Sequence, residues 1–153
     1  RIKAIKKIIP NCAISTDIIT GFCGESDEQH QETISLLKEV EFDFSYMFFY
    51  SERPKTLAER KYDDDIPLST KKSRLQEVID LQHIHSKKKN ENAIGNTFEV
   101  LIEGFSKKSN EMLSGRNDQN TKVVFPKGNA KVGEYVNVKI ESCTTATLIG
   151  KII

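Results

Sequence analysis

The pattern of apolar and polar residues changes character about two-thirds of the way along this 153-residue chain. Before about residue 92, apolar residues occur in short runs or recur at helical spacing. After it, they occur in short segments that glycines separate, and they alternate with polar residues in places. The first part therefore predicts an α/β arrangement, and the second predicts an all-β one.

Two apolar segments in the first part predict buried strands. Residues 13–20 and 45–50 are short and rich in β-branched or aromatic side chains, which strands favour. Between them, Ser26 stands where a helix N-cap belongs, Gln29 completes a capping box, and an apolar stripe continues to about Val40. Strand, glycine turn, helix and strand together predict a βαβ unit with parallel strands.

Two further helices are predicted around this unit. Residues 1–9 carry isoleucines at helical spacing, and Pro10 ends that helix. A long helix begins at Ser69 or Thr70 and ends in the lysines of residues 87–89. The apolar positions of this helix are Leu75, Val78, Ile79, Leu81 and Ile84. The segment 51–67 between strand and helix is expected to be irregular, with its acidic run as a solvated loop or, less favoured, a Mg²⁺ site.

The second part predicts a small closed barrel. Glycines punctuate five short segments of strand character, which follow one another at the spacing typical of small barrels. The domain boundary is expected near residues 92–95. The five predicted strands are residues 97–103, 112–116, 121–125, 135–141 and 147–152.

Charge changes the picture only locally. The chain has a net charge of +1, which excludes a histone-like nucleic-acid coat. Residues 105–131, however, hold six basic and two acidic side chains, a local charge of +4, with phenylalanines and amides among them. A small barrel with such a surface is typical of oligonucleotide binders. Phe125 either stacks on a base or belongs to the core, and the lysines either neutralise phosphates or solvate a loop.

Cysteine usage and hydropathy limit the cell compartment and the classes of protein that fit this chain. Three widely spaced cysteines, Cys12, Cys23 and Cys143, favour a reducing cytosol over a secreted disulfide framework. No apolar run is long enough to span a membrane. The cysteines and histidines do not have the spacing of a zinc site. Because the chain begins at Arg1 within a helical pattern, we expect it to be a piece of a longer protein.

Several motifs resemble those of one family, the radical S-adenosylmethionine (SAM) methylthiotransferases. ISTDIITGFCGE at residues 14–25 resembles the family's strand-and-turn signature STDIIVGFPGE, and YSERPKT at residues 50–56 resembles its YSxRPGT loop. The likeness is greatest to the MiaB-type branch, which modifies tRNA. The family's linker helix is resembled by Arg74-Leu75 and Leu81-Gln82. Its C-terminal TRAM barrel is resembled by Glu103-Gly104, Gly115-Arg116-Asn117 and Val123-Val124-Phe125.

The resemblance implies a fold in three parts. Residues 1–68 would be the last strands and helices of a partial TIM-like radical SAM domain, residues 69–94 a linker helix, and residues 95–153 a five-stranded, OB-like TRAM barrel. The complete cytoplasmic enzyme, expected to be a monomer, would methylthiolate an isopentenylated adenosine beside the tRNA anticodon. It would use SAM and two [4Fe-4S] clusters. The family's cluster motif CxxxCxxC has no match in this chain, so the ligands are expected upstream, and the sulfur donor is not indicated.

The resemblance also suggests site residues. Cofactor binding is expected at Asp17, Gly21, Gly24, Glu25 and Arg53, on the rim formed by strand ends, where exposed glycine amides could bond to adenine. Asp17 is expected to be buried in its strand, with a cofactor role or a structural hydrogen bond. RNA binding is expected at Lys107, Lys108, Arg116, Asn120, Lys122 and Phe125.

Two departures and two alternatives accompany this interpretation. Cys23 stands where the family mostly has proline, and Lys55 stands where glycine is usual, so local turn geometry is expected to differ. The alternatives are a methylthiotransferase that acts on an aspartate of a ribosomal protein, and a chain that serves as an RNA-binding module only.

Overall fold

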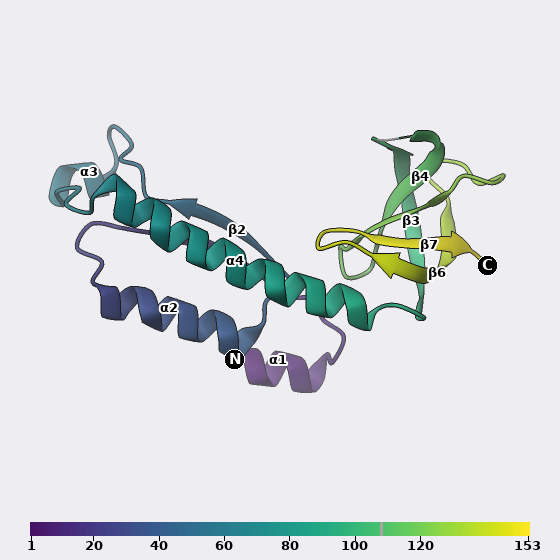
Figure 1. Ribbon diagram of the computed structural model, residues 1–153, viewed down its shortest axis with the longest axis horizontal. Coiled ribbons are helices and arrows are strands. Elements are labelled where there is room, and N and C mark those ends of the chain that lie inside the picture. The colour runs from purple at the N-terminus through teal and green to yellow at the C-terminus, as the bar shows by residue number, and fades with distance from the viewer. Residues whose placement is uncertain (108) are drawn as a thin grey trace. The chain divides into compact units, whose positions relative to one another are not determined.

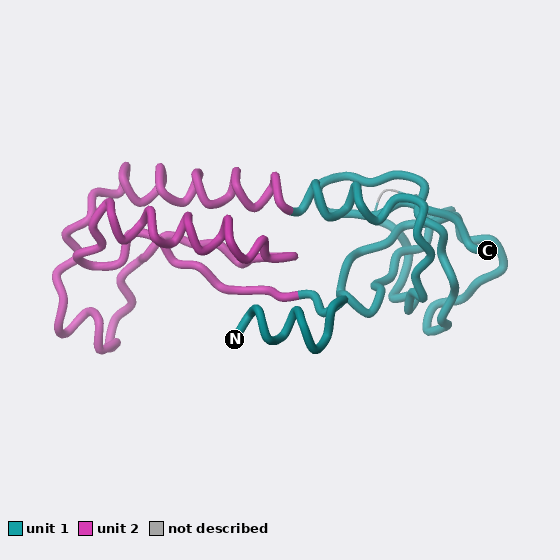
Figure 2. Tube along the Cα trace, turned by 90° about the horizontal axis from the view of Figure 1, so that it is seen from below, with its two compact units in different colours: residues 1–13, 86–153 teal, residues 14–85 magenta. Residues whose placement is uncertain are grey.

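The computed structural model describes residues 1–107 and 109–153 (Figure 1). The chain forms two compact units (Figure 2). The α/β unit comprises residues 14–85, and the barrel unit comprises residues 1–13 and 86–153. The sequence analysis instead grouped residues 1–13 with the segment up to residue 68, and that domain assignment stays a prediction.

The α/β unit contains the βαβ arrangement that the pattern predicts. Strands β1 (Ser15–Thr20) and β2 (Phe44–Phe49) pair in parallel, with Ser15 opposite Phe44 and Thr20 opposite Phe49. Helix α2 (Asp27–Val40) connects them. Its predicted capping box is confirmed, because the Gln29 amide donates to Ser26 Oγ at 3.3 Å and the Ser26 amide donates to Gln29 Oε1 at 3.0 Å.

The two faces of this small sheet differ in burial. Ile18, Thr20 and Ser45 point to the buried face. Ile19, Tyr46 and Phe48 point the other way and are 55–57% exposed. The apolar core of the unit comes from β1, α2, the segment before β2, and α4: Ile18, Ile34, Leu37, Val40, Phe42 and Val78. The opposite sheet face therefore presents aromatic and aliphatic side chains that nothing in this unit covers.

Helix α4 (Leu68–Asn92) has the predicted position, but few of its apolar side chains are fully buried. Val78 is buried, whereas Ile84 is 63% exposed. The other buried positions of its α/β portion are polar, and they are Lys71, Arg74, Gln82 and His85. Polar side chains tolerate burial where hydrogen bonds satisfy them, and three of these four bond to β1, β2 or the loops beside them.

One short helix escaped sequence prediction. Helix α3 (Leu57–Lys61) lies in the segment that was expected to be irregular. Thr56 caps it, because its Oγ1 accepts a hydrogen bond from the Glu59 amide at 3.3 Å. Five residues are too few to give a helical period in the sequence, and the threonine cap was the only local signal.

The barrel unit contains the predicted five-stranded closed barrel. Its strands are β3 (Thr97–Ser106), β4 (Ser109–Asn117), β5 (Lys122–Pro126), β6 (Tyr135–Cys143) and β7 (Leu148–Ile152). They close in the order β3-β4-β5-β7-β6, with β5 and β7 parallel and the other pairs antiparallel. The core consists of inward-facing apolar residues: Val100, Ile102, Leu113, Val123, Phe125, Val138, Ile140 and Leu148.

Helix α1 (Ile2–Ile8) precedes this barrel in the chain and belongs to the same unit. No residue of α1 is buried. Gln119 Nε2 donates to the Asn11 carbonyl at 3.0 Å, which ties the segment after α1 to the β4–β5 turn. Across residues 1–107 and 109–153, no helix combines the length and apolar character that crossing a membrane requires.

Candidate cofactor pocket and nucleic-acid surface

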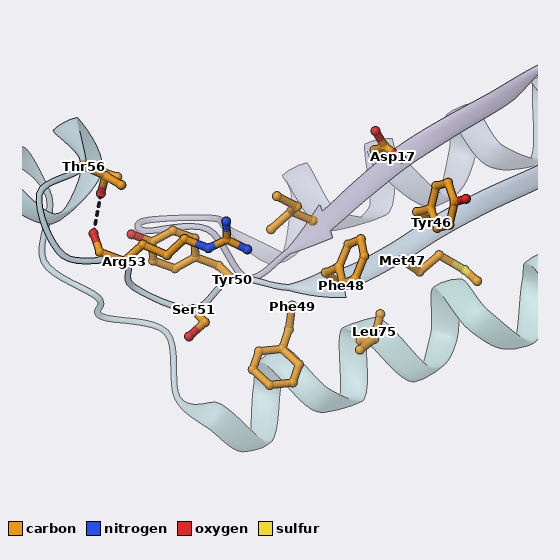
Figure 3. A pocket seen from close by; sticks show the side chains of 12 residues that line it. Asp17, Tyr46, Met47, Phe48, Phe49, Tyr50, Ser51, Arg53, Thr56 and Leu75 are labelled. Atoms are coloured by element: carbon orange, nitrogen blue, oxygen red, sulfur yellow. Dashed lines mark hydrogen bonds between the residues drawn. The ribbon is translucent and has the colours of Figure 1, made fainter.

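A pocket of about 830 Å³ lies at β1 and β2 in the α/β unit, and its lining includes side chains from both faces of β2 (Figure 3). Its apolar lining includes Ile19 and Phe48. Two charged residues also line it, Asp17 on β1 and Arg53 in the loop after β2 (Figure 3). A concave apolar surface with a few charged groups is the usual form of a small-molecule site, and its volume falls in the common range of about 300–1,000 Å³.

The loop that carries Arg53 is braced internally. The Arg53 carbonyl accepts hydrogen bonds from Thr56 Oγ1 at 2.8 Å and from the Thr56 amide at 3.3 Å. Lys55 adopts a left-handed backbone, with φ of 70°, and its amide donates to Glu59 Oε2 at 2.9 Å. This conformation explains why a glycine is usual here, and the lysine in its place carries backbone strain of about 1–2 kcal/mol.

Asp17 was expected to be buried, and the structure corrects that expectation. Its side chain lies on the uncovered face of β1, between the outward-facing Ser15 and Ile19. The alternation of side chains along a strand places Ile18 and Thr20 on the covered face and Asp17 on the other. Asp17 is therefore available to a ligand in the pocket instead of requiring a partner inside a core.

The glycine turn after β1 adopts the predicted backbone but does not offer free amides. Gly21 and Gly24 have φ of 68° and 75°. The Gly21 amide donates to Glu25 Oε2 at 2.6 Å, and the Gly24 amide donates to Asp65 Oδ1 at 2.7 Å. Both amides therefore have partners within the protein in this structure, and cofactor binding at these glycines stays a prediction. Neither these two glycines nor Glu25 lines the pocket.

Glu25 instead takes part in a buried clasp with helix α4. Arg74 Nη1 donates to Glu25 Oε2 at 2.7 Å and to the Glu25 carbonyl at 2.9 Å, and Nη2 donates to Asp27 Oδ1 at 2.7 Å. Burial alone would lower the pKa of Arg74, but the bonds with Asp27 and Glu25 outweigh it and raise the pKa. The clasp fixes the turn to α4 and so holds the end of β1 in place.

The acidic run before α4 also has internal partners. Asp64 forms an ion pair with the buried Lys71, whose Nζ also donates to the Tyr50 carbonyl at 3.3 Å. Asp65 accepts from Gly24, as described above. Within residues 1–107 and 109–153, no group of three or more His, Cys, Asp or Glu residues is placed to hold a metal ion. The run thus serves the packing of the loop against α4.

Cys23, the other departure from the family pattern, lies beside Tyr50. Burial, followed by a hydrogen bond with the Cys23 thiol and nearby negative charge, raises the pKa of Tyr50. Phe22 packs edge-on against Tyr50, with ring centroids 4.9 Å apart. Phe22 and Cys23 thus both make side-chain contacts with Tyr50.

On the barrel, the structure brings together some of the predicted RNA-binding residues. Arg116 on β4 stands directly opposite Lys122 on β5, and Asn120 lies in the turn between them. Arg116 Nη1 donates to the Asn120 carbonyl at 2.8 Å. Lys107 lies in the turn at the opposite end of β4, and Lys108 lies outside the described residues.

Phe125 does not belong to this surface. Its side chain is 0% exposed and forms part of the barrel core. The prediction that Phe125 stacks on a base is therefore wrong, and the alternative of a core residue is correct. The strand alternation on β5 places Lys122 and Phe125 on opposite faces, since they lie three residues apart.

The barrel's class follows from its sequence as well as its topology. Residues 91–153 match the TRAM domain family, so the barrel unit contains a TRAM domain. The predicted TRAM barrel is thereby confirmed. It is a five-stranded closed barrel with Arg116 and Lys122 side by side on its outer surface.

The whole chain is similar to a particular group of proteins. It is 60% identical over 147 residues to the tRNA-2-methylthio-N(6)-dimethylallyladenosine synthase of Christiangramia forsetii, covering 96% of this chain and 31% of that protein. The synthase of the same name from Amoebophilus asiaticus is 54% identical over 153 residues, covering 99% of this chain and 32% of that protein. The chain therefore spans about a third of the length of these curated relatives. The resemblance drawn from the motifs is confirmed.

Proposed function

We propose that this chain is the C-terminal portion of a tRNA-2-methylthio-N(6)-dimethylallyladenosine synthase. The observation that carries the proposal is 60% identity to such a synthase over 96% of the chain. In the complete enzyme, residues 1–68 would end a partial TIM-like radical SAM domain, residues 69–94 would form the linker helix, and residues 95–153 would form the TRAM barrel. The relatives' names favour tRNA over the alternative of a ribosomal-protein aspartate.

The pocket on β1 and β2 fits SAM as a cofactor. SAM carries an ammonium and a carboxylate on its methionine portion and a flat adenine whose faces can pack against apolar side chains. Asp17 would hold the ammonium, Arg53 the carboxylate, and the ring of Phe48 or the side chain of Ile19 would contact the adenine. When bound, SAM supplies the methyl group and the radical. The contribution of this chain is to bind and orient it.

The iron–sulfur clusters need ligands from elsewhere in the protein. The cysteines here, Cys12, Cys23 and Cys143, do not form a cluster-binding group among the described residues. We place the ligands of both [4Fe-4S] clusters in the part of the relatives that this chain does not span. A tRNA substrate would place the enzyme, which we take to be a monomer, in the cytoplasm.

The decisive experiment uses the full-length parent protein. After anaerobic reconstitution of its clusters, it is incubated with SAM and tRNA that carries isopentenylated adenosine, and the digested nucleosides are analysed by mass spectrometry. We expect the methylthiolated nucleoside. The 153-residue chain alone, treated identically, should give none. If the intact protein leaves the tRNA without a methylthio group but methylthiolates a ribosomal-protein peptide, the proposal is rejected in favour of the alternative.

Arg53→Met should weaken SAM binding to the full-length enzyme by about ten- to a hundredfold. A hydrogen bond to a charged group contributes about 1.5–3 kcal/mol, and methionine retains bulk without charge. Isothermal titration would measure the dissociation constant. Lys61→Met is the matched control, because Lys61 is exposed on α3 and does not line the pocket. Equal affinities for both variants would remove Arg53 from the site.

Lys122→Ala should reduce the salt dependence of RNA binding. Each phosphate contact to a single strand contributes about 0.7 to the slope of log affinity against log salt concentration. We therefore expect the slope to fall by about that amount when an anticodon stem-loop is titrated with the chain. Lys38→Ala, exposed on α2 of the other unit, is the matched control. An unchanged slope would place Lys122 away from the phosphates.

A further inference from the structure

The strand register of the barrel aligns four outward side chains in one row. Lys122 on β5 stands opposite Arg116 on β4, Arg116 opposite Leu101 on β3, and Leu101 opposite Tyr135 on β6. Residues directly opposite one another on antiparallel strands share a face, with Cβ atoms about 4.5–5.5 Å apart. We name these four residues the barrel row.

Burial confirms that the barrel row points away from the core. Tyr135 is 64% exposed, Arg116 is exposed, and Leu101 and Lys122 are half-buried. The next position along each of three of these strands points inward: Ile102 and Val123 are buried in the core, and Gly115 lies between them. The row is therefore a continuous outer stripe, with two cations at one end and an exposed tyrosine ring at the other.

We infer that the barrel row binds a single-stranded nucleotide segment of the substrate RNA, with an unpaired base stacked on Tyr135 and the adjoining phosphates at Arg116 and Lys122. The inference rests on the proposed function and deepens it. Oligonucleotide-binding barrels combine a positively charged track with aromatic side chains on which bases stack. The row contains both parts, and Leu101 supplies an apolar floor between them.

The dimensions and the charges of the row suit this ligand. Three strand spacings of about 4.8 Å make the row about 14 Å long. The row would therefore hold only part of the strand of about 4–16 nucleotides that such a barrel binds. Arg116 Nε lies 3.5 Å from Glu103 Oε2, and both side chains are about half exposed. An exposed ion pair of this kind contributes little to stability, so a phosphate can replace the carboxylate at small cost. The bond from Arg116 Nη1 to the Asn120 carbonyl keeps the guanidinium in place.

Sequence analysis missed Tyr135 because its window of positive charge ended at residue 131. Tyr135 is distant from Arg116 in the chain and reaches its surface only through the pairing of β3 with both β4 and β6. Because tyrosine is uncharged, the contribution of stacking to RNA affinity can be measured separately from that of the charged residues. Removing its ring should change affinity without changing the number of counterions released.

The test titrates a labelled anticodon stem-loop RNA with the 153-residue chain by fluorescence anisotropy, from about 50 to 200 mM salt. Tyr135→Ala should weaken binding about five- to a hundredfold with an unchanged salt slope, because one stacked base is lost. Tyr135→Phe keeps the ring and should stay within about twofold of the wild type. Arg116→Ala should lower the slope by about 0.7. Val132→Ala, 52% exposed on the same unit, is the control and should bind normally.

A scan with abasic RNA separates stacking from a structural effect of the mutation. Removing the stacked base from the loop should weaken wild-type binding by the same factor as Tyr135→Ala, and should have no effect in the Tyr135→Ala background. The inference is overturned if wild type and Tyr135→Ala bind the RNA equally well. It is also overturned if the losses are additive at every abasic position, or if the chain does not bind RNA. If the full-length enzyme still methylthiolates tRNA in any of these cases, the proposed function stands without this inference.

Discussion

Gly115→Ala is expected to destabilise the barrel by at least about 3 kcal/mol. A Cβ at Gly115 would lie 2.1 Å from the Leu101 carbonyl oxygen and 2.8 Å from a methyl carbon of Val100. Leu101 belongs to the neighbouring strand, and backbone in a closed barrel cannot move aside without breaking the pairing of β3 with β4. Overpacking usually costs about 1–3 kcal/mol, and here the obstacle is backbone instead of a flexible side chain.

Gly104→Ala is the matched control for this prediction. Gly104 lies on β3 of the same barrel, and a Cβ there would meet nothing within 4 Å. We expect that substitution to be neutral, or to stabilise by up to about 1 kcal/mol, because alanine reduces the freedom of the unfolded chain. Hydrogen–deuterium exchange of residues 97–126 measures both variants. Similar protection in the two would show that the close approach at Gly115 does not constrain the barrel.

Arg74→Met should destabilise the α/β unit by about 3–5 kcal/mol. The Arg74 and Glu25 side chains are only 8% and 13% exposed, so removing the guanidinium leaves a buried carboxylate without its cation. Breaking a buried pair by removing one partner costs this much, even where the pair itself adds little net stability. Urea unfolding followed by circular dichroism at helical wavelengths would measure the loss, since α2 and most of α4 lie in this unit.

Two further variants check the cause. Lys72→Met changes an exposed residue on the same helix and should alter stability by no more than about 0.5 kcal/mol. Glu25→Gln in the Arg74→Met background removes the uncompensated charge and should recover part of the loss. If the double variant loses as much free energy of unfolding as Arg74→Met and Glu25→Gln lose together, the clasp is not the reason for the destabilisation.

The fold could be predicted from the sequence where local chemistry and periodicity agree. Ser26 and Gln29 mark the start of α2, the β-branched run before Gly21 marks β1, and glycine-separated apolar segments mark the barrel strands. These signals depend on neighbours in the chain. Helix α3 is too short to carry such a signal, and its five residues lay in the segment expected to be irregular.

The candidate sites depended more on distant contacts, and there the sequence was less informative. Three polar residues that α4 buries, Lys71, Arg74 and Gln82, have partners within residues 20–64, which the helix's own period cannot reveal. The amides of Gly21 and Gly24 are occupied by carboxylates, one of which is 41 residues away. Phe125 is buried and Tyr135 is exposed, because strand alternation and register decide which ring faces solvent.

The polar face of α4 has a consequence for the order of folding. Its bonds to Thr20, Glu25, Asp27, Phe42 and Ser45 join residues 37–51 positions apart in the chain. Each bond is formed only when both partners are in place, so this polar face gains less from partial contact than an apolar face would. We therefore expect these bonds to form after the main folding barrier and to act mainly by slowing unfolding. Helix α4 would then determine how long the α/β unit persists once folded, more than how fast it folds.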